Sequence, residues 1–454
     1  MSGEHGLSEI SKENIHASQQ ASETRIEKSV PPYDKATCSN GIIDLAVAVN
    51  KLNENEILQF LNKANRIEKH NLDYGSSYGS VKLRTAISGV INRHFMPHHN
   101  IVPDDIIVTN GCTAALDLLT SVMCNPGDAI LVSAPFYSKF ETDMYVKSRG
   151  RVYPVYVPVN EVESEDQVKY FEAKITELKK SGEITPKVLV VCNPHNPLGK
   201  CYPERTIKAL LRFANRHSIY VVMDEIYALS VYRTPEDVST DKSDNTDVVY
   251  PFKSVLSFEN LSEIIDPSLV IVLHGLSKDF CMNGLRMGWV VSPFNKNFVI
   301  AAKVISKIYF ISSTTDSLVT NFLSDTEFID NFISTNQRRL KENYYKITEY
   351  LTRNNVSYVS ACAGVYIWVD LRRQLMVWKN KNLRPGQAQV TSVEQLTFDD
   401  EGEMWASAIN IGRVCIVSGQ PFKSTEPGWF RIILAIPWET LELGLDRLLG
   451  FLLK

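Results

Sequence analysis

A lysine that follows a serine and precedes an arginine by eight residues forms the most chemically suggestive group in the chain. Ser277, Lys278 and Arg286 stand in the run HGLSKDFCMNGLRMGWV, with glycines on both sides of the arginine. A lysine amine can form a Schiff base with an aldehyde, while a hydroxyl and a guanidinium can hold a phosphate. The run therefore suits a covalently held, phosphorylated aldehyde. A solvated lysine on an ordinary loop is the alternative.

A turn of small residues is a second candidate for anion binding. Asn110, Gly111, Cys112 and Thr113 follow the apolar run IIVT and precede the helix-like stretch AALDLLTSVM. Backbone N–H groups at the start of a helix can bind an anion, and the helix dipole favours a negative charge there. The segment predicts part of a phosphate site, and simple turn chemistry explains these residues alone equally well.

Two further turns carry side chains suited to a flat heteroaromatic ring. Tyr137, in the run APFY, can stack on such a ring or belong to the core. The turn NPHNPLG has two X-Pro steps that project Asn196, whose amide can donate to a ring oxygen. We interpret His195 in this turn as a turn residue rather than as a catalyst.

Asp224 and Arg431 are charged residues in or directly after apolar runs, where burial is costly unless a partner of opposite charge is present. Asp224 follows the apolar run IYVVM, and a buried carboxylate needs a cation such as a protonated pyridine nitrogen. Capping of the next segment is the alternative for Asp224. Tyr227 can bond the same ring oxygen as Asn196. Arg431 lies inside an apolar run, which favours a grip on a substrate carboxylate or a structural ion pair.

Size and composition are those of an ordinary enzyme with two lobes. The 454 residues are 44% hydrophobic and 22% charged, and the net charge of −4 argues against a nucleic-acid partner. No apolar run approaches the roughly 20 residues that span a bilayer, so no membrane partner is expected. Eight cysteines show neither CxxC pairs nor regular spacing, and His98-His99 reads as an exposed loop. We expect no metal, no disulfide framework and reduced thiols in the cytoplasm.

Short β-branched runs alternate with longer amphipathic segments between about residues 100 and 300. This alternation predicts an α/β fold whose large domain holds a mostly parallel sheet flanked by helices. Open sheets of this kind bind ligands beyond the carboxyl ends of their strands, where the polar motif residues cluster. The expected strands lie within residues 105–110, 128–134, 187–193, 219–225 and 269–275.

A smaller α+β lobe is expected after about residue 315. Its predicted elements are a helix over 325–351, strands over 365–372 and 429–436, and a closing helix over 440–453. The predicted division is a flexible N-terminal arm at 1–34, the N-terminal part of the small domain at 35–70, the large domain at 71–312 and the C-terminal small domain at 313–454. The polar stretches 234–266 and 375–404 are interpreted as insertions or lids.

The assembled motifs resemble those of fold-type I, pyridoxal-phosphate-dependent enzymes of the class I/II aminotransferase superfamily. Within it, the chain is most similar to the 1-aminocyclopropane-1-carboxylate synthase-like branch. The resemblance covers roughly residues 35–454 and rests on GIIDLAVAVNKL, YGSSYGSVKLR, NPGDAILVSAPFYSKF, NPHNPLGK, DEIY, SKDFCMNGLRMG and EPGWFR. It implies pyridoxal 5′-phosphate as cofactor, a sheet of the seven-stranded type and a homodimer with paired active sites.

The resemblance also implies a role for each motif residue. Lys278 would form the internal aldimine and shuttle protons, and Asp224 would keep the pyridine nitrogen protonated so that the ring acts as an electron sink. Arg431 would bind the substrate α-carboxylate. The other cofactor contacts would come from residues around the ring and the phosphate, namely Tyr137, Asn196, Tyr227, Gly111, Cys112, Thr113, Ser277 and Arg286.

A tyrosine of the N-terminal part would act across the dimer interface. Tyr74, five residues before Gly79, matches the family tyrosine that reaches the neighbouring subunit's cofactor, and it is the third expected catalytic residue. Tyr78 is a rival for this role because the spacing of the segment varies within the branch.

Two departures from the branch bear on substrate and cofactor. Val49 stands where the cyclopropane-forming synthases have a glutamate that serves their cationic substrate, S-adenosylmethionine. Loss of such a charge-assisted contact costs about 1.5–3 kcal/mol, or about 10- to 150-fold in affinity, which disfavours that reaction. Val49 and Asn50 remain expected substrate-binding residues. Gly275 replaces a serine near the phosphate, and binding is expected to survive through Ser277 and Arg286.

The motifs favour an aminotransferase-type enzyme of specialised metabolism that acts on an α-amino acid through an external aldimine and a quinonoid. A carbon–sulfur lyase acting on a thioether amino acid is the main alternative, because the same lysine and aspartate serve elimination equally well. A cyclopropane-forming synthase and a non-catalytic binding protein of the same fold are less favoured. Lys278 is present, and the polar first 30 residues are too short for a DNA-binding module.

Overall fold

The computed structural model describes residues 6–22, 30–180, 182, 184–240 and 248–453. Its larger sheet has seven strands in the order β2-β8-β7-β6-β5-β3-β4. The strands are β2 (Ile106–Thr109), β3 (Ala129–Ala134), β4 (Arg151–Tyr156), β5 (Pro186–Cys192), β6 (Tyr220–Asp224), β7 (Val270–Gly275) and β8 (Gly288–Val291). Only β8 runs antiparallel to its neighbours, so the predicted mostly parallel sheet is confirmed.

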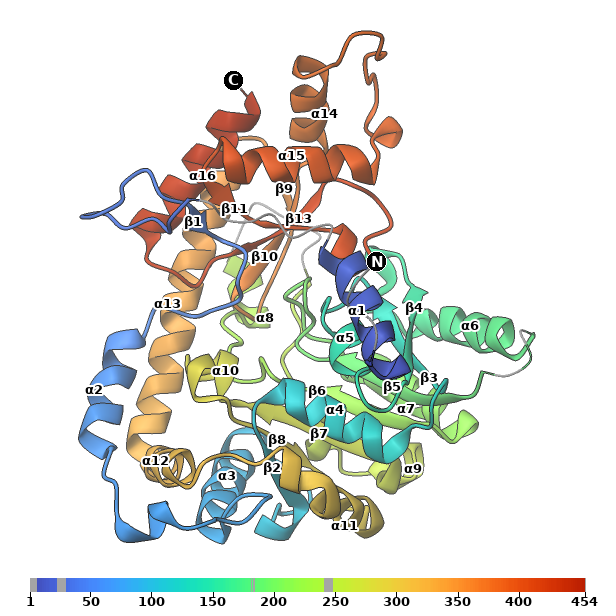
Figure 1. The fold of residues 1–454 in the computed structure, drawn as a ribbon, viewed down its shortest axis with the longest axis vertical. Helices are drawn as coiled ribbons and strands as arrows, with labels where there is room; N and C mark the ends of the chain where they lie inside the picture. The colour runs from blue at the N-terminus through green and yellow to red at the C-terminus, as the bar shows by residue number, and fades with distance from the viewer. Residues whose placement is uncertain (1–5, 23–29, 181, 183, 241–247, 454) are drawn as a thin grey trace.

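Helices cover both faces of this sheet because its strands are apolar on both sides. In β7, Val270 and Val272 belong to the core on one face, whereas Ile271 and Leu273 belong to the core on the other. The first face carries α3 (Val81–His94), α6 (Val168–Lys180), α7 (Glu204–His217), α9 (Leu261–Ile264) and α12 (Ser313–Ser324), and the second carries α4 (Cys112–Met123), α5 (Phe140–Asp143) and α11 (Lys296–Ile305). Figure 1 shows the sheet between these layers.

A second sheet of four antiparallel strands lies above the first in Figure 1. It consists of β9 (Ser357–Val359), β10 (Tyr366–Asp370), β12 (Val417–Ser418) and β13 (Trp429–Ile433). Alternate residues divide its two faces: Ile367 and Phe430 pack with α13 (Thr326–Arg353) and α16 (Trp438–Leu453), whereas Trp368 packs with the core of the larger sheet. The elements α14 (Arg372–Lys381), α15 (Phe398–Asn410) and β11 (Val414–Cys415) complete this lobe.

The N-terminal segment joins the second lobe. Strand β1 (Ile43–Asp44) pairs in parallel with β11, and α2 (Glu54–Ala64) follows beside α12. The expected division at 35–70, 71–312 and 313–454 stays a prediction. It is supported by the strand positions, since every strand of the larger sheet lies within 106–291 and every strand of the smaller one within 357–433.

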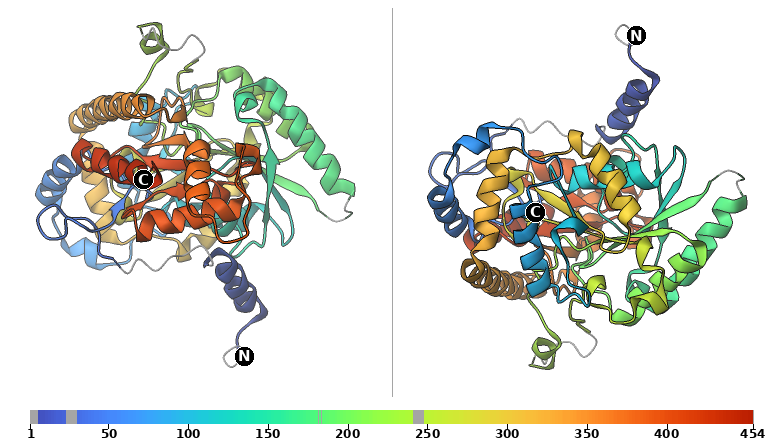
Figure 2. Two further views of the ribbon diagram at one scale, coloured as in Figure 1. Left: turned by 90° about the horizontal axis from the view of Figure 1, so that it is seen from above. Right: turned by 90° about the horizontal axis from the view of Figure 1, so that it is seen from below.

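The predicted N-terminal arm contains a helix, α1 (Glu9–Ser22), which projects from the body in both views of Figure 2. Its attachment is polar: Arg149 donates to Asn14 Oδ1 at 2.8 Å, and the Tyr145 hydroxyl donates to Glu13 at 3.3 Å. Residues 1–5 and 23–29 of the arm lie outside the described residues.

Of the two predicted insertions, 234–266 contains α8 (Pro235–Thr240) and α9, and its residues 241–247 lie outside the described part. The 375–404 stretch overlaps α14 and α15 and is therefore partly helical.

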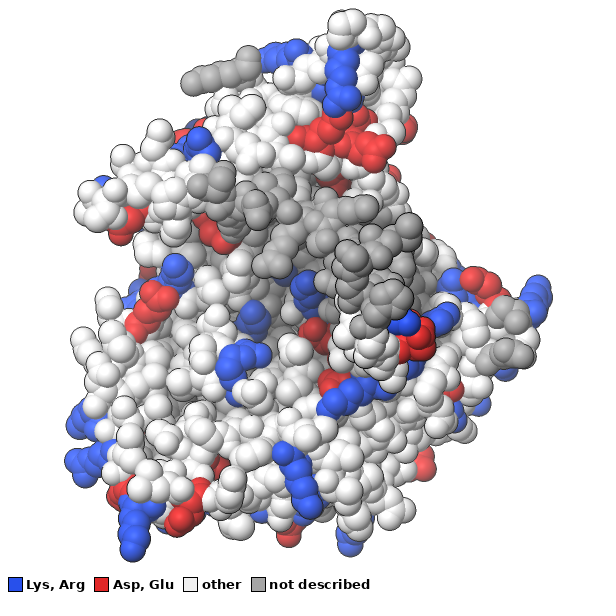
Figure 3. Space-filling view, in the orientation of Figure 1, with Lys and Arg blue, Asp and Glu red and all other residues white. Residues whose placement is uncertain are grey.

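Charges of both signs are spread over the face of the molecule that Figure 3 shows. No helix among the described residues is both long and apolar enough to cross a membrane. Within the same residues, no three His, Cys, Asp or Glu side chains gather in a way that could hold a metal ion. The eight cysteines all lie in the described part of the chain and form no disulfide bond there, and His98 and His99 lie on an exposed turn.

One buried asparagine attaches the N-terminal segment to the long helix α13. Asn336 Oδ1 accepts hydrogen bonds from the side-chain amides of Asn50 and Asn53, each at 2.7 Å. One turn later, Arg339 donates to the Leu52 carbonyl at 2.6 Å. These contacts position the segment that precedes α2 against the second lobe.

We expect Asn336→Ala to lower the free energy of unfolding by about 2–4 kcal/mol, because two buried amide donors lose their acceptor. Urea unfolding followed by circular dichroism measures the change. Asn331→Ala, on an exposed position of the same helix, is the matched control and should change the stability by less than about 0.5 kcal/mol. Equal effects of the two substitutions would contradict the anchoring role.

Candidate active site

Five parallel strands end at one edge of the larger sheet, and each brings a residue singled out from the sequence to that edge. Gly111 follows β2, Tyr137 follows β3, Asn196 follows β5, Asp224 ends β6 and Lys278 follows β7. Strands β5, β6 and β7 are direct neighbours, so the last three residues come from adjacent positions along this edge. The arrangement is the one expected for ligand binding at an open α/β sheet.

Lys278 lies in the short helix α10 (Leu276–Asp279) and is half-buried. Its Nζ donates to the Ala48 carbonyl at 2.6 Å. Burial lowers the pKa of Lys278 to about 8, and the Arg431 guanidinium is the next largest cause. A larger fraction of this amine is therefore neutral near pH 7 than for a solvated lysine, which favours nucleophilic attack and proton transfer. No motif in the sequence pointed to the Ala48 contact.

Asp224 is buried, with 6% of its surface exposed. Its carboxylate accepts a long hydrogen bond from the Ile226 N–H, at 3.3 Å. Burial raises the pKa of Asp224 to about 7. Its neighbour Glu225 serves the structure differently, since it accepts hydrogen bonds from the Ser254 hydroxyl at 2.7 Å and the Val255 N–H at 3.0 Å. A cation beside Asp224 would restore the charged carboxylate.

A tight contact between backbone and guanidinium surrounds the start of α4. Gly111 has φ +86°, and a Cβ on it would lie 2.6 Å from Nη2 of Arg286. Arg286 itself occupies the left-handed region with φ 51°. A Cβ on Gly288 would lie 2.7 Å from the backbone nitrogen of Cys112. Because of this close approach, the first N–H groups of the helix and the Arg286 guanidinium lie around the same small space. Such a set of donors suits an anion.

The side chains at this helix start are already engaged. The Cys112 thiol donates to the His274 carbonyl at 3.5 Å, and burial raises the pKa of this thiol. The Thr113 hydroxyl donates to Asp143 at 3.1 Å. Ser277 is buried beside Lys278. Backbone groups, the Ser277 hydroxyl and Arg286 are therefore the anion donors that this region offers.

Arg431 comes from β13 and is 5% exposed. It donates to Asn196 Oδ1 at 3.1 Å and to the Ala46 carbonyl at 3.0 Å, while its buried Nε has no hydrogen-bond partner among the described residues. The Phe422 ring lies 4.9 Å from the guanidinium carbon. Its neighbours are thus neutral oxygens and a ring, so the interpretation as a structural ion pair gains no support. No sequence signal pointed to Phe422, which ends a three-residue turn of 3-10 helix.

Tyrosines form the wall between the two lobes. The Tyr227 and Tyr366 rings meet edge to face at 5.3 Å, and the Tyr366 hydroxyl donates to the His195 carbonyl at 3.3 Å. Tyr137 is half-buried against Phe140. Burial lowers the pKa of His195 to about 3, so its ring is neutral. The Leu198 N–H donates to the His195 ring at 3.4 Å, as expected for a turn residue.

The remaining expected residues come from the N-terminal part of the chain. Tyr74 is 97% exposed, whereas the Tyr78 ring is flanked by Arg84 at 4.9 Å and Lys303 at 4.8 Å. Val49 is half-buried next to Ala48. The Asn50 side chain is occupied within the chain, because it bonds Asn336 and accepts from the Leu52 N–H.

We expect Gly288→Ala to destabilise the protein by about 1–3 kcal/mol, because its methyl group would meet the backbone at the start of α4. Gly284→Ala is the matched control in the same segment, since a Cβ on Gly284 would meet nothing within 4 Å and its φ is ordinary. Thermal unfolding of both variants measures the difference. A stable Gly288→Ala variant would mean that the close approach is not required.

Comparison with known proteins places this geometry in a family. The model of aminotransferase class I and II matches residues 40–448. A probable aminotransferase, gliI, of Aspergillus fumigatus is 31% identical over 389 residues, which are 85% of this chain and 83% of that protein. 1-Aminocyclopropane-1-carboxylate synthase 2 of Cucurbita pepo is 28% identical over 434 residues, which are 92% of this chain and 80% of that protein.

Solved structures show the same fold. Aspartate aminotransferase from Thermus thermophilus with maleate matches with a TM-score of 0.70 at 20% identity, over 98% of this chain and 100% of that one. Aromatic aminotransferase from Pyrococcus horikoshii matches with a TM-score of 0.68 at 19% identity, over 90% and 95%. The predicted fold class and superfamily are confirmed. The chain belongs to the class I and II aminotransferase family, whose members use pyridoxal 5′-phosphate.

Proposed function

We propose that this protein is an aminotransferase-type enzyme that uses pyridoxal 5′-phosphate to act on an α-amino acid. The observation that carries the proposal is the juxtaposition, at one sheet edge, of an amine with a lowered pKa, Lys278, and a buried carboxylate, Asp224. A buried guanidinium, Arg431, acts on the same amine. These groups together can bind an aldehyde cofactor, polarise its ring and hold a substrate carboxylate.

The residues around this edge fit the cofactor. The helix start at Gly111, Cys112 and Thr113, together with Arg286 and Ser277, would hold the phosphate, as the close approach of Gly111 to Arg286 supports. Around the ring, Asn196 and Tyr227 would face its oxygen, and Tyr137 would cover its face. When bound, the cofactor supplies an aldehyde for the lysine amine and an electron-withdrawing ring.

Lys278 and Asp224 would divide the proton chemistry between them. With a pKa near 8, the Lys278 amine can both accept the substrate Cα proton and return one. The raised pKa of Asp224 reflects burial without a firm cationic partner, and a protonated ring nitrogen beside it would stabilise the carboxylate form.

The substrate would be gripped from the second lobe. The unpartnered Nε of Arg431 and its exchangeable contacts with neutral oxygens support binding of an α-carboxylate. Val49 would present an apolar surface to the substrate, which suits a substrate amino acid with an uncharged side chain. Asn50 is held by Asn336, which supports a role in fixing the segment that carries Ala48 and Val49.

Transamination is preferred over elimination because one of the matched relatives is named a probable aminotransferase. The same residues serve a carbon–sulfur lyase, which remains the alternative. The absence of the glutamate at Val49 disfavours a cyclopropane-forming synthase. The apolar side chain of Val49 leads us to favour specialised amino-acid metabolism.

We also propose a cytoplasmic homodimer in which Tyr74 contributes to the partner subunit's site. The exposed apolar surface around Tyr74, with Leu72 at 80% and Ile67 at 67% exposure, supports a covered interface. Tyr78 is less suited because Arg84 and Lys303 already flank its ring. Eight cysteines without a disulfide bond in the described part of the chain support the cytoplasmic location. Sedimentation equilibrium should give twice the chain mass, and a monomer at micromolar concentration would overturn the interface.

The reaction is tested by incubating the holoenzyme with a panel of amino acids and thioether conjugates, with and without 2-oxoglutarate. Transamination gives keto acids only when the acceptor is present, whereas release of pyruvate or ammonia without it identifies the lyase.

Reduction with borohydride should attach the cofactor to Lys278 and leave the Lys278→Ala variant unlabelled. The rate at which the apoenzyme binds the cofactor aldehyde should increase as the pH rises through about 8 and level off above it. The reason is that the neutral Lys278 amine is the reactive form. Label at another lysine would refute the assignment.

Arg431→Gln should raise KM for the amino acid by about 10- to 150-fold, because a charge-assisted contact to the carboxylate is lost. Steady-state kinetics with the amino acid and with the corresponding amine, which lacks the carboxylate, separates this contact from general damage. The variant and the wild type should use the amine equally poorly. Arg372→Gln, an arginine of the same lobe that is ion-paired with Asp370 and Glu426, is the control and should leave KM unchanged.

A further inference from the structure

Two buried cysteines from distant parts of the chain meet where the lobes join. The sulfur atoms of Cys201 and Cys362 lie 3.8 Å apart, although the residues are 161 positions apart in sequence. Their exposed fractions are 1% and 3%. Both are free thiols, and neither belongs to the group around Lys278.

The backbone already holds these two segments together. Cys201 follows the turn that carries Asn196 and ends at Gly199, and Cys362 precedes β10. The Gly199 carbonyl accepts hydrogen bonds from the N–H groups of Cys362, at 2.7 Å, and Ala363, at 3.0 Å. A Cβ on Gly199 would lie only 2.6 Å from the Ala361 side chain, so the segments are in close contact. A disulfide bond of about 2.05 Å requires the sulfurs, now 3.8 Å apart, to approach by less than about 2 Å.

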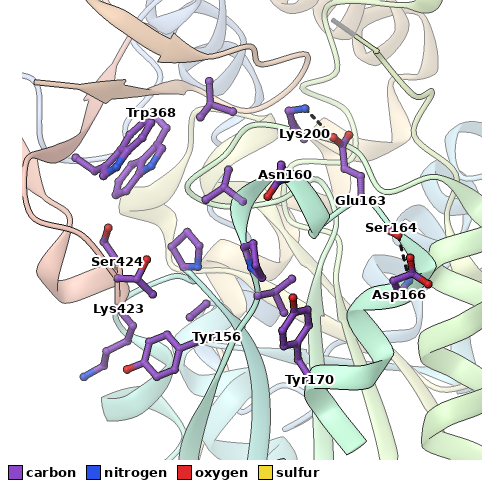
Figure 4. Close-up of a pocket in the computed structure, with 18 of the residues that line it drawn as sticks. Tyr156, Asn160, Glu163, Ser164, Asp166, Tyr170, Lys200, Trp368, Lys423 and Ser424 are labelled. Atoms are coloured by element: carbon purple, nitrogen blue, oxygen red, sulfur yellow. Dashed lines mark hydrogen bonds and ion pairs between the residues drawn. The ribbon is translucent and has the colours of Figure 1, made fainter. Parts of the chain in front are cut away.

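A cavity of about 970 Å³ lies next to the segment that leads into Cys201, although neither cysteine lines it. Its wall includes Lys200, directly before Cys201, and Glu163, which is paired with Lys200 at 2.7 Å (Figure 4). Tyr250 also lines the cavity and packs on the small core that contains both cysteines. The Glu163 carboxylate acts on the pKa of both thiols, which places it near them.

We propose that Cys201 and Cys362 form an oxidisable dithiol, which a small hydroperoxide converts into a disulfide between the Asn196 turn and the second lobe. In the first step, one thiolate attacks the outer peroxide oxygen, the O–O bond breaks, and an alcohol or water leaves as the sulfur becomes a sulfenic acid. The second thiol then attacks that sulfur and releases water. Two thiols lose two electrons and two protons in total, and the hydroperoxide is reduced by two electrons.

Cys362 is the better candidate for the first attack. The hydrogen bond between the thiols lowers the pKa of Cys362, whereas the same contact and burial raise the pKa of Cys201. The guanidinium of Arg233 donates to the Ala361 carbonyl at 2.9 Å and lies beside this segment. A cationic neighbour favours the thiolate, which is the reactive form of cysteine.

The disulfide would join elements that position Arg431, the residue proposed to bind the substrate carboxylate. Asn196 accepts a hydrogen bond from Arg431, and Arg431 is the cross-strand partner of Trp368 in β10. The bond would close a loop between residues 161 positions apart, which restricts the unfolded chain. The oxidised protein should therefore unfold at a higher temperature than the reduced protein.

The experiment treats the full-length holoenzyme with hydrogen peroxide, alkylates the remaining thiols and maps its peptides without reduction. We expect one linked pair, Cys201 with Cys362, that dithiothreitol separates, and an increase of a few degrees in the unfolding midpoint that dithiothreitol reverses. Cys362→Ala should lose both effects, and Cys201→Ala should lose the link. Cys38→Ser, which changes a half-buried thiol elsewhere, should retain both effects.

Two results would overturn the proposal. One is oxidation of other cysteines, such as Cys38, while Cys201 and Cys362 remain alkylatable. The other is a linked pair that forms only in urea, since it would arise from the unfolded chain. If Cys362→Ala fails to fold, the wild-type peptide map alone still decides the outcome. The map is independent of turnover, so it separates this dithiol from the proposed amino-acid chemistry.

Discussion

The cost of taking charge out of water governs this structure more than any other constraint. Lys278, Asp224 and Arg431 are buried or half-buried at one edge of a sheet, and burial is the largest cause of the shifted pKa of each. Fixed ionic partners would quench this reactivity, and the protein instead gives these groups carbonyl and amide contacts. Under the proposed function, a bound cofactor and an anionic substrate would offset this electrostatic cost.

The fold supplies the rigidity that such a site needs. Parallel strands bring the ends of β5, β6 and β7 into neighbouring positions, and both faces of the sheet are covered by apolar helices. Close glycine contacts then bring the start of α4 to within van der Waals distance of β8. Because packed interiors adjust little, groups held in this way keep the spacing on which their mutual influence depends.

Most of the architecture could be predicted from the sequence, because its signals are local. Apolar runs that end in polar turns located the strands, and the order of the motifs pointed to the residues at their ends. Contacts made by the backbone or by short turns carried no such signal: the Ala48 carbonyl that accepts from Lys278, and Phe422 on Arg431, have no characteristic residue type. The helix α1 was also missed, since its polar sequence has no apolar face to reveal it. The hydrogen bond from Asn50 to Asn336 depends on a partner 286 positions away.

Asn196 shows how the two lobes share one site. Its side-chain oxygen accepts from Arg431, so the amide of a turn on the larger sheet orients a guanidinium carried by the smaller one. The same turn is bonded through His195 to Tyr366 and through Gly199 to Cys362, both near the start of β10. A shift of the second lobe would therefore move Arg431, which is proposed to bind the substrate carboxylate. The same shift would disturb the proposed contact between Asn196 and the cofactor oxygen. Under the proposed function, substrate binding and cofactor orientation would therefore be coupled through this single turn, which is hydrogen-bonded to residues of both sheets.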